Sequence, residues 1–156
     1  MLDFATKDLL LAMGHHLLIF ALAAVLVFEI AVIRADLSAA DIRRAGKVDL
    51  WYGIIAALIL AVGFTRAVYA AKGWAYYSVN AFFWAKIGTF AVIGLLSVVP
   101  TVALIRWRRA LTDDPAFMPA PAAIANVRRF MWMEAGLFAL LPLFAAAMAR
   151  GYGMPS

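Results

Sequence analysis

Four apolar stretches, each long enough to cross a lipid bilayer, constrain this chain more than any other feature. They cover residues 9–33, 50–71, 79–105 and 130–149. A membrane-spanning helix needs about 20 mostly apolar residues. None of the four stretches alternates apolar and polar residues with the period of two that is typical of barrel strands. We therefore predict an all-α fold, an integral membrane four-helix bundle that takes up residues 1–156 as a single transmembrane domain.

The composition excludes several classes of protein. The chain is 67% apolar and 15% charged, with a mean hydropathy of +0.91, whereas soluble domains are about half apolar and a quarter charged. It has no cysteine and two histidines. Disulfides, thiolate metal sites, iron–sulfur clusters and zinc sites built from several histidines are therefore excluded. No phosphate-binding loop or nucleophile–base motif supports a nucleotide-binding protein or a hydrolase.

The basic residues are unequally divided between the two ends of the predicted bundle. Nine flank the first and third connections, and three lie on the side of the termini. The nine are Arg34, Arg43, Arg44, Lys47, Arg106, Arg108, Arg109, Arg128 and Arg129, and the three are Lys7, Lys72 and Arg150. By the positive-inside rule we expect both termini outside, in a bacterial inner membrane. Topology thus explains the net charge of +5, and we expect the lipid bilayer as partner and no nucleic acid.

Three ionisable residues are predicted at one depth in the outer half of the membrane. His15 lies seven residues beyond Asp8, which is about 10 Å of helix. Lys86 and Arg66 lie about 9 Å inside the ends of their spans. An ionisable residue inside a span indicates a functional site, although basic side chains this near a helix end can also snorkel to the surface. Arg150 is expected nearer the outer surface.

Glu29, Asp49, Tyr52 and Glu134 are predicted to form a second polar layer near the inner side. Glu29 follows His15 by fourteen positions, which at 100° per residue puts both on nearly one helix face. If Glu29 points into the bundle, His15 does too, so we favour His15 as a ligand and His16 as an interface residue. We expect Glu29 and Glu134 themselves to pair with basic residues of the inner rim, namely Arg34 and either Arg128 or Arg129.

The outer layer has the chemistry of a haem b site. His15, or alternatively His16, would supply an axial nitrogen to the iron. Lys86 would be a second ligand or a cation at the redox site, and so the candidate catalytic residue. Arg66 and Arg150 would bind the propionates.

Several local features refine the expected bundle. Ser38 and Asp41 resemble a capping box, which predicts a short interfacial helix before the second span. Pro100 and Pro142 are expected to kink the third and fourth spans. The segment DDPAFMPAPAA predicts a turn or extended loop. Small residues at positions 53, 57 and 61 would let a neighbouring helix approach closely.

The chain also resembles a known group of proteins. An uncharacterised family of bacterial four-helix membrane proteins is similar over nearly the whole chain, through HHLLIFALAAVLVFE, VDLWYGIIAALILAVGFTR, KGWAYYSVNAFFWAKIGTFAVIGLLSVVPT and MARGYG. A wider similarity joins it to the copper-resistance-D domain and the HemJ-type protoporphyrinogen oxidase, through His15 or His16 and the pair Trp84 and Lys86. In the HemJ-type enzymes the matching histidine and lysine are implicated in haem binding, which implies His15 or His16 as ligand and Lys86 as its partner. A lysine normally precedes that histidine there, whereas Met13 and Gly14 do so here.

Three functions follow as hypotheses. The first is a haem b protein of electron transfer or of a small oxidoreductase reaction. The second is copper or proton-coupled cation handling, with Glu29, Asp49 and Glu134 as proton-linked acids, or with copper(I) held by His15 and the methionines at positions 13, 148 and 154. The third is an accessory subunit without catalytic activity. A homodimer or a larger membrane complex is compatible with each.

Overall fold

A computed structural model describes residues 3–69 and 72–155, and over these ranges the chain is helical and without strands. The helices are α1 (Phe4–Val32), α2 (Ala39–Tyr69), α3 (Gly73–Ser78), α4 (Ala81–Asp113), α5 (Pro121–Phe138) and α6 (Leu140–Ala149). Four segments are long and apolar enough to cross a membrane, namely α1, α2, α4 and the run Pro121–Ala149 that comprises α5 and α6. The predicted all-α membrane fold is thus confirmed.

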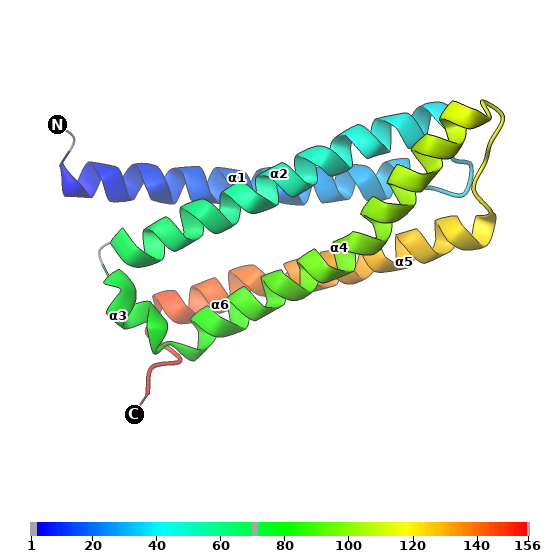
Figure 1. The fold of residues 1–156 in the computed structure, drawn as a ribbon. Coiled ribbons are helices and arrows are strands. Elements are labelled where there is room, and N and C mark those ends of the chain that lie inside the picture. The colour runs from blue at the N-terminus through cyan, green and yellow to red at the C-terminus, as the bar shows by residue number, and fades with distance from the viewer. Residues whose placement is uncertain (1–2, 70–71, 156) are drawn as a thin grey trace.

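The helices run back and forth between two ends of an elongated bundle (Figure 1). The connections between α1 and α2 and between α4 and α5 lie at one end, which we call the basic end. Both described ends of the chain and α3 lie at the other, which we call the terminal end. All four spanning segments are longer than the apolar windows in the sequence, because the helices continue past the apolar residues.

The start of α2 shows why the helix is longer than its window. The Ser38 hydroxyl accepts a hydrogen bond from the Asp41 amide at 3.2 Å, and the Asp41 carboxylate accepts from the Ser38 amide at 3.1 Å. This reciprocal pair is the expected capping box. The helix that it starts continues unbroken to Tyr69, so the predicted interfacial helix is the first part of α2 itself.

Prolines shape the third and fourth spans in different ways. Pro100 is buried inside α4, which stays helical through it and changes direction near its middle (Figure 1). The run from α5 to α6 is interrupted at Ala139, three residues before Pro142. Proline has no amide hydrogen to donate to the carbonyl four residues earlier, so a bend or break is expected there. The proline-rich segment forms the loop 114–120, and α5 begins at Pro121.

Asn80 fastens the C-terminal tail to the start of α4. Its side-chain oxygen accepts hydrogen bonds from the amides of Phe82 and Phe83 at 3.0 and 3.2 Å, while its side-chain nitrogen donates to the Tyr152 carbonyl at 2.9 Å. Gly153 follows with φ +84, and its carbonyl accepts from the Ala81 amide at 2.8 Å. A Cβ at position 153 would lie 2.6 Å from Phe82 Cδ2, so only glycine permits this approach.

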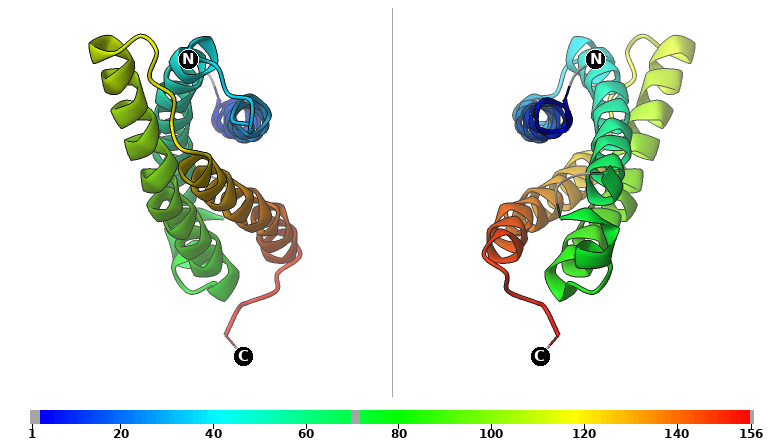
Figure 2. Two further views of the ribbon diagram at one scale, coloured as in Figure 1. Left: turned by 90° about the vertical axis from the view of Figure 1, so that its right-hand side faces the viewer. Right: turned by 90° about the vertical axis from the view of Figure 1, so that its left-hand side faces the viewer.

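The apolar core consists of two clusters stacked along the bundle. The basic-end cluster contains Ile33, Ile42, Leu104, Val127 and Met131, among others. The middle cluster contains Leu22, Leu26, Tyr52 and Ile59. Beyond the middle cluster the bundle opens: α1 contacts α2 and α5, and no contact joins α1 to α6 among the described residues. Figure 2 shows the same separation.

The stripe of small residues in α2 is exposed in the described part of the chain. Gly53, Ala57 and Ala61 are exposed on the outer face of α2, and a Cβ at Gly53 would meet nothing within 4 Å. The close approach of a neighbouring helix that the spacing predicts is thus not made within the described part of the chain.

Candidate functional site

His15 points from α1 into the bundle and packs against α2. Its side chain is buried, and a Cβ at Gly63 would lie 3.1 Å from the imidazole Cε1. The glycine therefore makes room for the ring. The Nδ1 atom is buried and has no hydrogen-bond partner among the described residues. An unpaired buried ring nitrogen is costly unless a further group binds it.

Two basic side chains from two other helices lie near this imidazole. Arg66 of α2 and Lys86 of α4 lie close enough for their charges to act on His15. The Arg66 Nε is buried without a partner in the described structure, and the Lys86 ammonium lies 6.0 Å from the centre of the Phe83 ring. The structure thus brings together His15, Arg66 and Lys86, which the sequence predicts at one depth in the membrane. We call them the outer cluster.

Three other candidates from the sequence do not join the outer cluster. His16 faces outward, and its Nδ1 lies 2.7 Å from the Ala12 carbonyl oxygen. Arg150 is exposed, and its Nη1 donates to the carbonyl of Ala146 in its own helix at 3.4 Å. Met13 is 53% exposed on α1, two residues before His15, whose side chain is buried.

The acidic residues form a second layer, to which α1, α2 and α5 contribute. The Tyr52 hydroxyl donates to Glu134 Oε2 at 3.1 Å, and the Thr101 hydroxyl of α4 donates to Asp49 Oδ1 at 2.7 Å. Glu29 is close enough to Asp49 and Glu134 for their charges to interact. One oxygen each of Glu29 and Glu134 is buried without a partner among the described residues. We call this group the acid layer.

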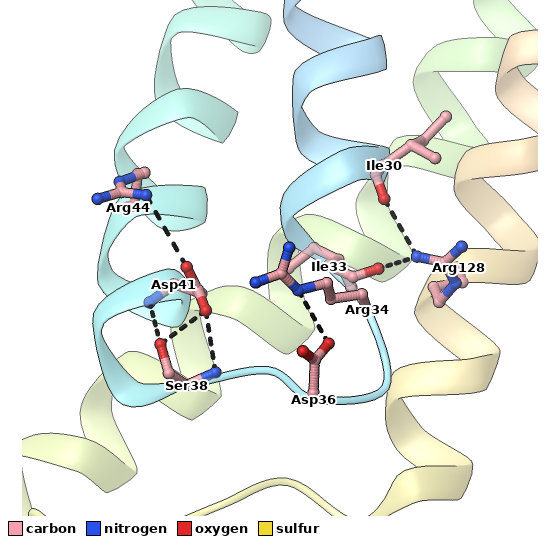
Figure 3. Close-up of polar contacts among 8 residues, drawn as sticks. All are labelled: Ile30, Ile33, Arg34, Asp36, Ser38, Asp41, Arg44 and Arg128. Carbon is pink, nitrogen blue, oxygen red and sulfur yellow. Dashed lines mark hydrogen bonds and ion pairs between the residues drawn. The ribbon is translucent and has the colours of Figure 1, made fainter.

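The prediction that Glu29 and Glu134 pair with the basic rim is wrong for the described structure. Arg34 pairs with Asp36 at 2.8 Å. The Arg128 guanidinium donates to the carbonyls of Ile30 and Ile33, at 3.1 Å to Ile30 (Figure 3). Carbonyls in the last turn of a helix have no partner within the helix, so Arg128 satisfies the end of α1 instead of a carboxylate.

An apolar layer separates the two polar layers. Leu22, Leu26 and Ile59 of the middle cluster lie between them. Along α1, His15 and Glu29 are fourteen residues apart, which is about 21 Å of helix. The outer cluster and the acid layer are therefore two sites and not one continuous polar path.

The donor set of the outer cluster includes groups that could hold a haem. No group of three or more His, Cys, Asp or Glu side chains that could hold a metal ion occurs over residues 3–69 and 72–155. An imidazole nitrogen is a common protein ligand of haem iron, and basic side chains commonly bind the propionates. His15 supplies an unpaired ring nitrogen, and Arg66 and Lys86 supply the cations.

Two residues that contribute to these sites, Thr101 and Gly63, are not predicted from the sequence. Thr101 gives a weak signal, since it is one of three hydroxyl residues in the span 79–105, beside Thr89 and Ser97. Gly63 gives none, because its role depends on the imidazole that packs against it from another helix.

The fold and these buried polar groups define the class: a helical membrane protein with four spans. The chain belongs to the family DUF2214, described as a predicted membrane protein, whose model matches residues 7–153. Neither the curated proteins nor the solved structures gave a match.

Proposed function

We propose that the protein binds haem b at the outer cluster and acts in electron transfer or a small oxidoreductase reaction. The observation that carries the proposal is the environment of His15. Its buried imidazole has an unpaired ring nitrogen and lies near two basic side chains. It also lies beyond the middle cluster, where α1 and α6 make no contact among the described residues. Bound haem would supply one-electron chemistry.

Each residue of the outer cluster has a distinct part in this proposal. His15 would hold the haem iron, and Gly63 lets its ring lie against α2. Arg66 binds a propionate, because a guanidinium offers a carboxylate two parallel donors. Lys86 is the second ligand if its amine is neutral, or otherwise a cation that balances the propionates. The similarity of Trp84 and Lys86 to the HemJ-type pattern supports the same assignment.

We place the protein in the bacterial inner membrane with both termini outside. The nine basic residues at the basic end support this orientation through the positive-inside rule. The outer cluster would then lie in the half of the membrane that faces away from the cytoplasm. The exposed small residues of α2 suit close contact with a helix of another chain, either a second copy or a subunit of a larger complex.

The test is an absorption spectrum of the detergent-purified protein, oxidised and dithionite-reduced, with iron, copper and haem determined on the same sample. The proposal predicts a Soret band, α and β bands on reduction, and near-stoichiometric haem. Lys86→Met should shift the spectrum or the midpoint potential and leave the helical content unchanged. A colourless protein that stays unchanged when haem is added would overturn the proposal.

Proton-coupled cation handling is the second candidate, and the acid layer favours it. Carboxylates from three helices interact in the membrane interior, and one oxygen of Glu29 has no partner within the described structure. Such acids commonly mark proton relays. This function predicts colourless protein whose ion flux in vesicles depends on pH and is abolished by Glu29→Gln but kept in His15→Ala.

A further inference from the structure

We propose that a cavity between α2 and α4 at the basic end binds a phosphate group, and specifically that of an anionic phospholipid headgroup. The cavity has a volume of about 350 Å³. It is lined by Ala40, Arg43, Arg44, Lys47 and Arg108. Four of the five lining side chains are therefore basic, and they come from two helices. This proposal is independent of the haem proposal, because it concerns the other end of the bundle.

Arg108 is placed at this cavity by a specific contact with α2. Its Nη1 donates to the Gly46 carbonyl at 3.4 Å, and a Cβ at position 46 would lie 2.3 Å from Arg108 Cδ. A Cβ at position 46 would therefore force the arginine side chain to shift from this place across α2. The cavity therefore depends on packing and not on charge alone.

The positive charge at the cavity has little compensation from the protein. Asp41 lies 3.9 Å from Arg44, but its carboxylate also accepts hydrogen bonds from Ser38 (Figure 3). Within residues 3–69 and 72–155, Arg43, Lys47 and Arg108 form no ion pair with a carboxylate. Three like charges around one cavity repel each other unless an anion binds between them.

The depth of the cavity matches that of lipid phosphates. The apolar windows end at Leu50 in α2 and at Ile105 in α4. Lys47 and Arg108 each lie three residues beyond these limits, which is about 5 Å of helix, and Arg43 about 10 Å. The polar region on each side of a bilayer is about 5–8 Å thick, so Lys47 and Arg108 lie within it and Arg43 lies just beyond it. Basic pockets between membrane helices at this depth bind anionic headgroups.

The test compares lipid binding by two double variants, each of which loses two positive charges at the basic end. Native mass spectrometry in detergent would count phosphatidylglycerol and phosphatidylcholine of equal chain length on the wild type, on Arg43→Gln/Arg108→Gln and on Arg106→Gln/Arg109→Gln. Only the first pair lines the cavity. We expect wild type to prefer phosphatidylglycerol and the cavity variant to lose about 30-fold in affinity, from two lost charges. The control variant should change less than threefold.

Gly46→Ala separates a formed cavity from general charge attraction. It keeps every charge but displaces the Arg108 side chain, so we expect several-fold weaker phosphatidylglycerol binding. Circular dichroism would verify that each variant keeps its helical content. Displacement of the lipid by millimolar inorganic phosphate would show that the site takes the phosphate group regardless of the acyl chains. Equal losses in the cavity and control variants, or no preference over phosphatidylcholine, would overturn the proposal.

Discussion

The hydrogen bond between Tyr52 and Glu134 joins α2 to α5 inside the acid layer. Tyr52→Phe would remove the donor and leave the carboxyl of Glu134, 1% exposed, without its partner. We expect a loss of about 0.6–2 kcal/mol in the free energy of unfolding, the range for hydrogen bonds between membrane helices. Unfolding in mixed detergent micelles would measure it. Tyr69→Phe, at an exposed position of the same helix, should change nothing, and an equal loss in both variants would contradict the assignment.

Gly63 controls the position of the His15 ring. An alanine Cβ would lie 3.1 Å from the imidazole Cε1, so the ring must move by a few tenths of an ångström. If His15 ligates haem, Gly63→Ala should shift the reduced α band or the midpoint potential. Gly53→Ala is the matched control, because its Cβ would meet nothing within 4 Å. Identical spectra for Gly63→Ala and wild type would show that the ring does not hold the iron.

For single residues, the sequence correctly predicts which side chains of one helix point inward, because helix geometry alone determines this. The fourteen-residue spacing placed His15 on the same inward face as Glu29, and both are buried while His16 is exposed. It failed where the partner comes from another helix. The expected pairing of Glu29 and Glu134 with arginines was wrong. The Tyr52 hydroxyl binds Glu134 instead, and Arg128 binds the carbonyls at the end of α1.

At the scale of elements, α4 and the C-terminal tail depend on each other through Asn80. Asn80→Ala removes the acceptor of two helix amides and the donor to Tyr152. Loss of such a cap costs about 1 kcal/mol, and the tail should detach from α4. Carboxypeptidase digestion in detergent would detect the freed tail. Ser78→Ala is the control, and a tail equally resistant in Asn80→Ala would contradict this role.

The elements were predictable to different degrees. Apolar length gives the number of spans, but the helix ends depend on caps such as Ser38 with Asp41, which extend α2 eleven residues before Leu50. The short helix α3 is too brief to leave a periodic signal. Kinks at Pro100 and Pro142 could be expected, because the missing amide hydrogen is a property of the residue itself.

At the scale of the whole molecule, the orientation in the membrane can be measured directly, because the chain contains no cysteine. We expect Tyr152→Cys, in the tail, to react with a membrane-impermeant maleimide on spheroplasts. Asp114→Cys, in the loop at the basic end, should react only after the membrane is permeabilised. The opposite pattern would reverse the orientation and place the outer cluster on the cytoplasmic side.

Along its axis the molecule thus consists of the outer cluster, an apolar layer, the acid layer and the basic end. The haem proposal rests on the first of these regions. The most direct test compares His15→Ala with His16→Ala, a matched pair of neighbouring histidines, by reduced-minus-oxidised spectra and haem content per protein. We predict that His15→Ala loses the haem signal and His16→Ala keeps it. Equal haem in both variants, or loss only in His16→Ala, would contradict it.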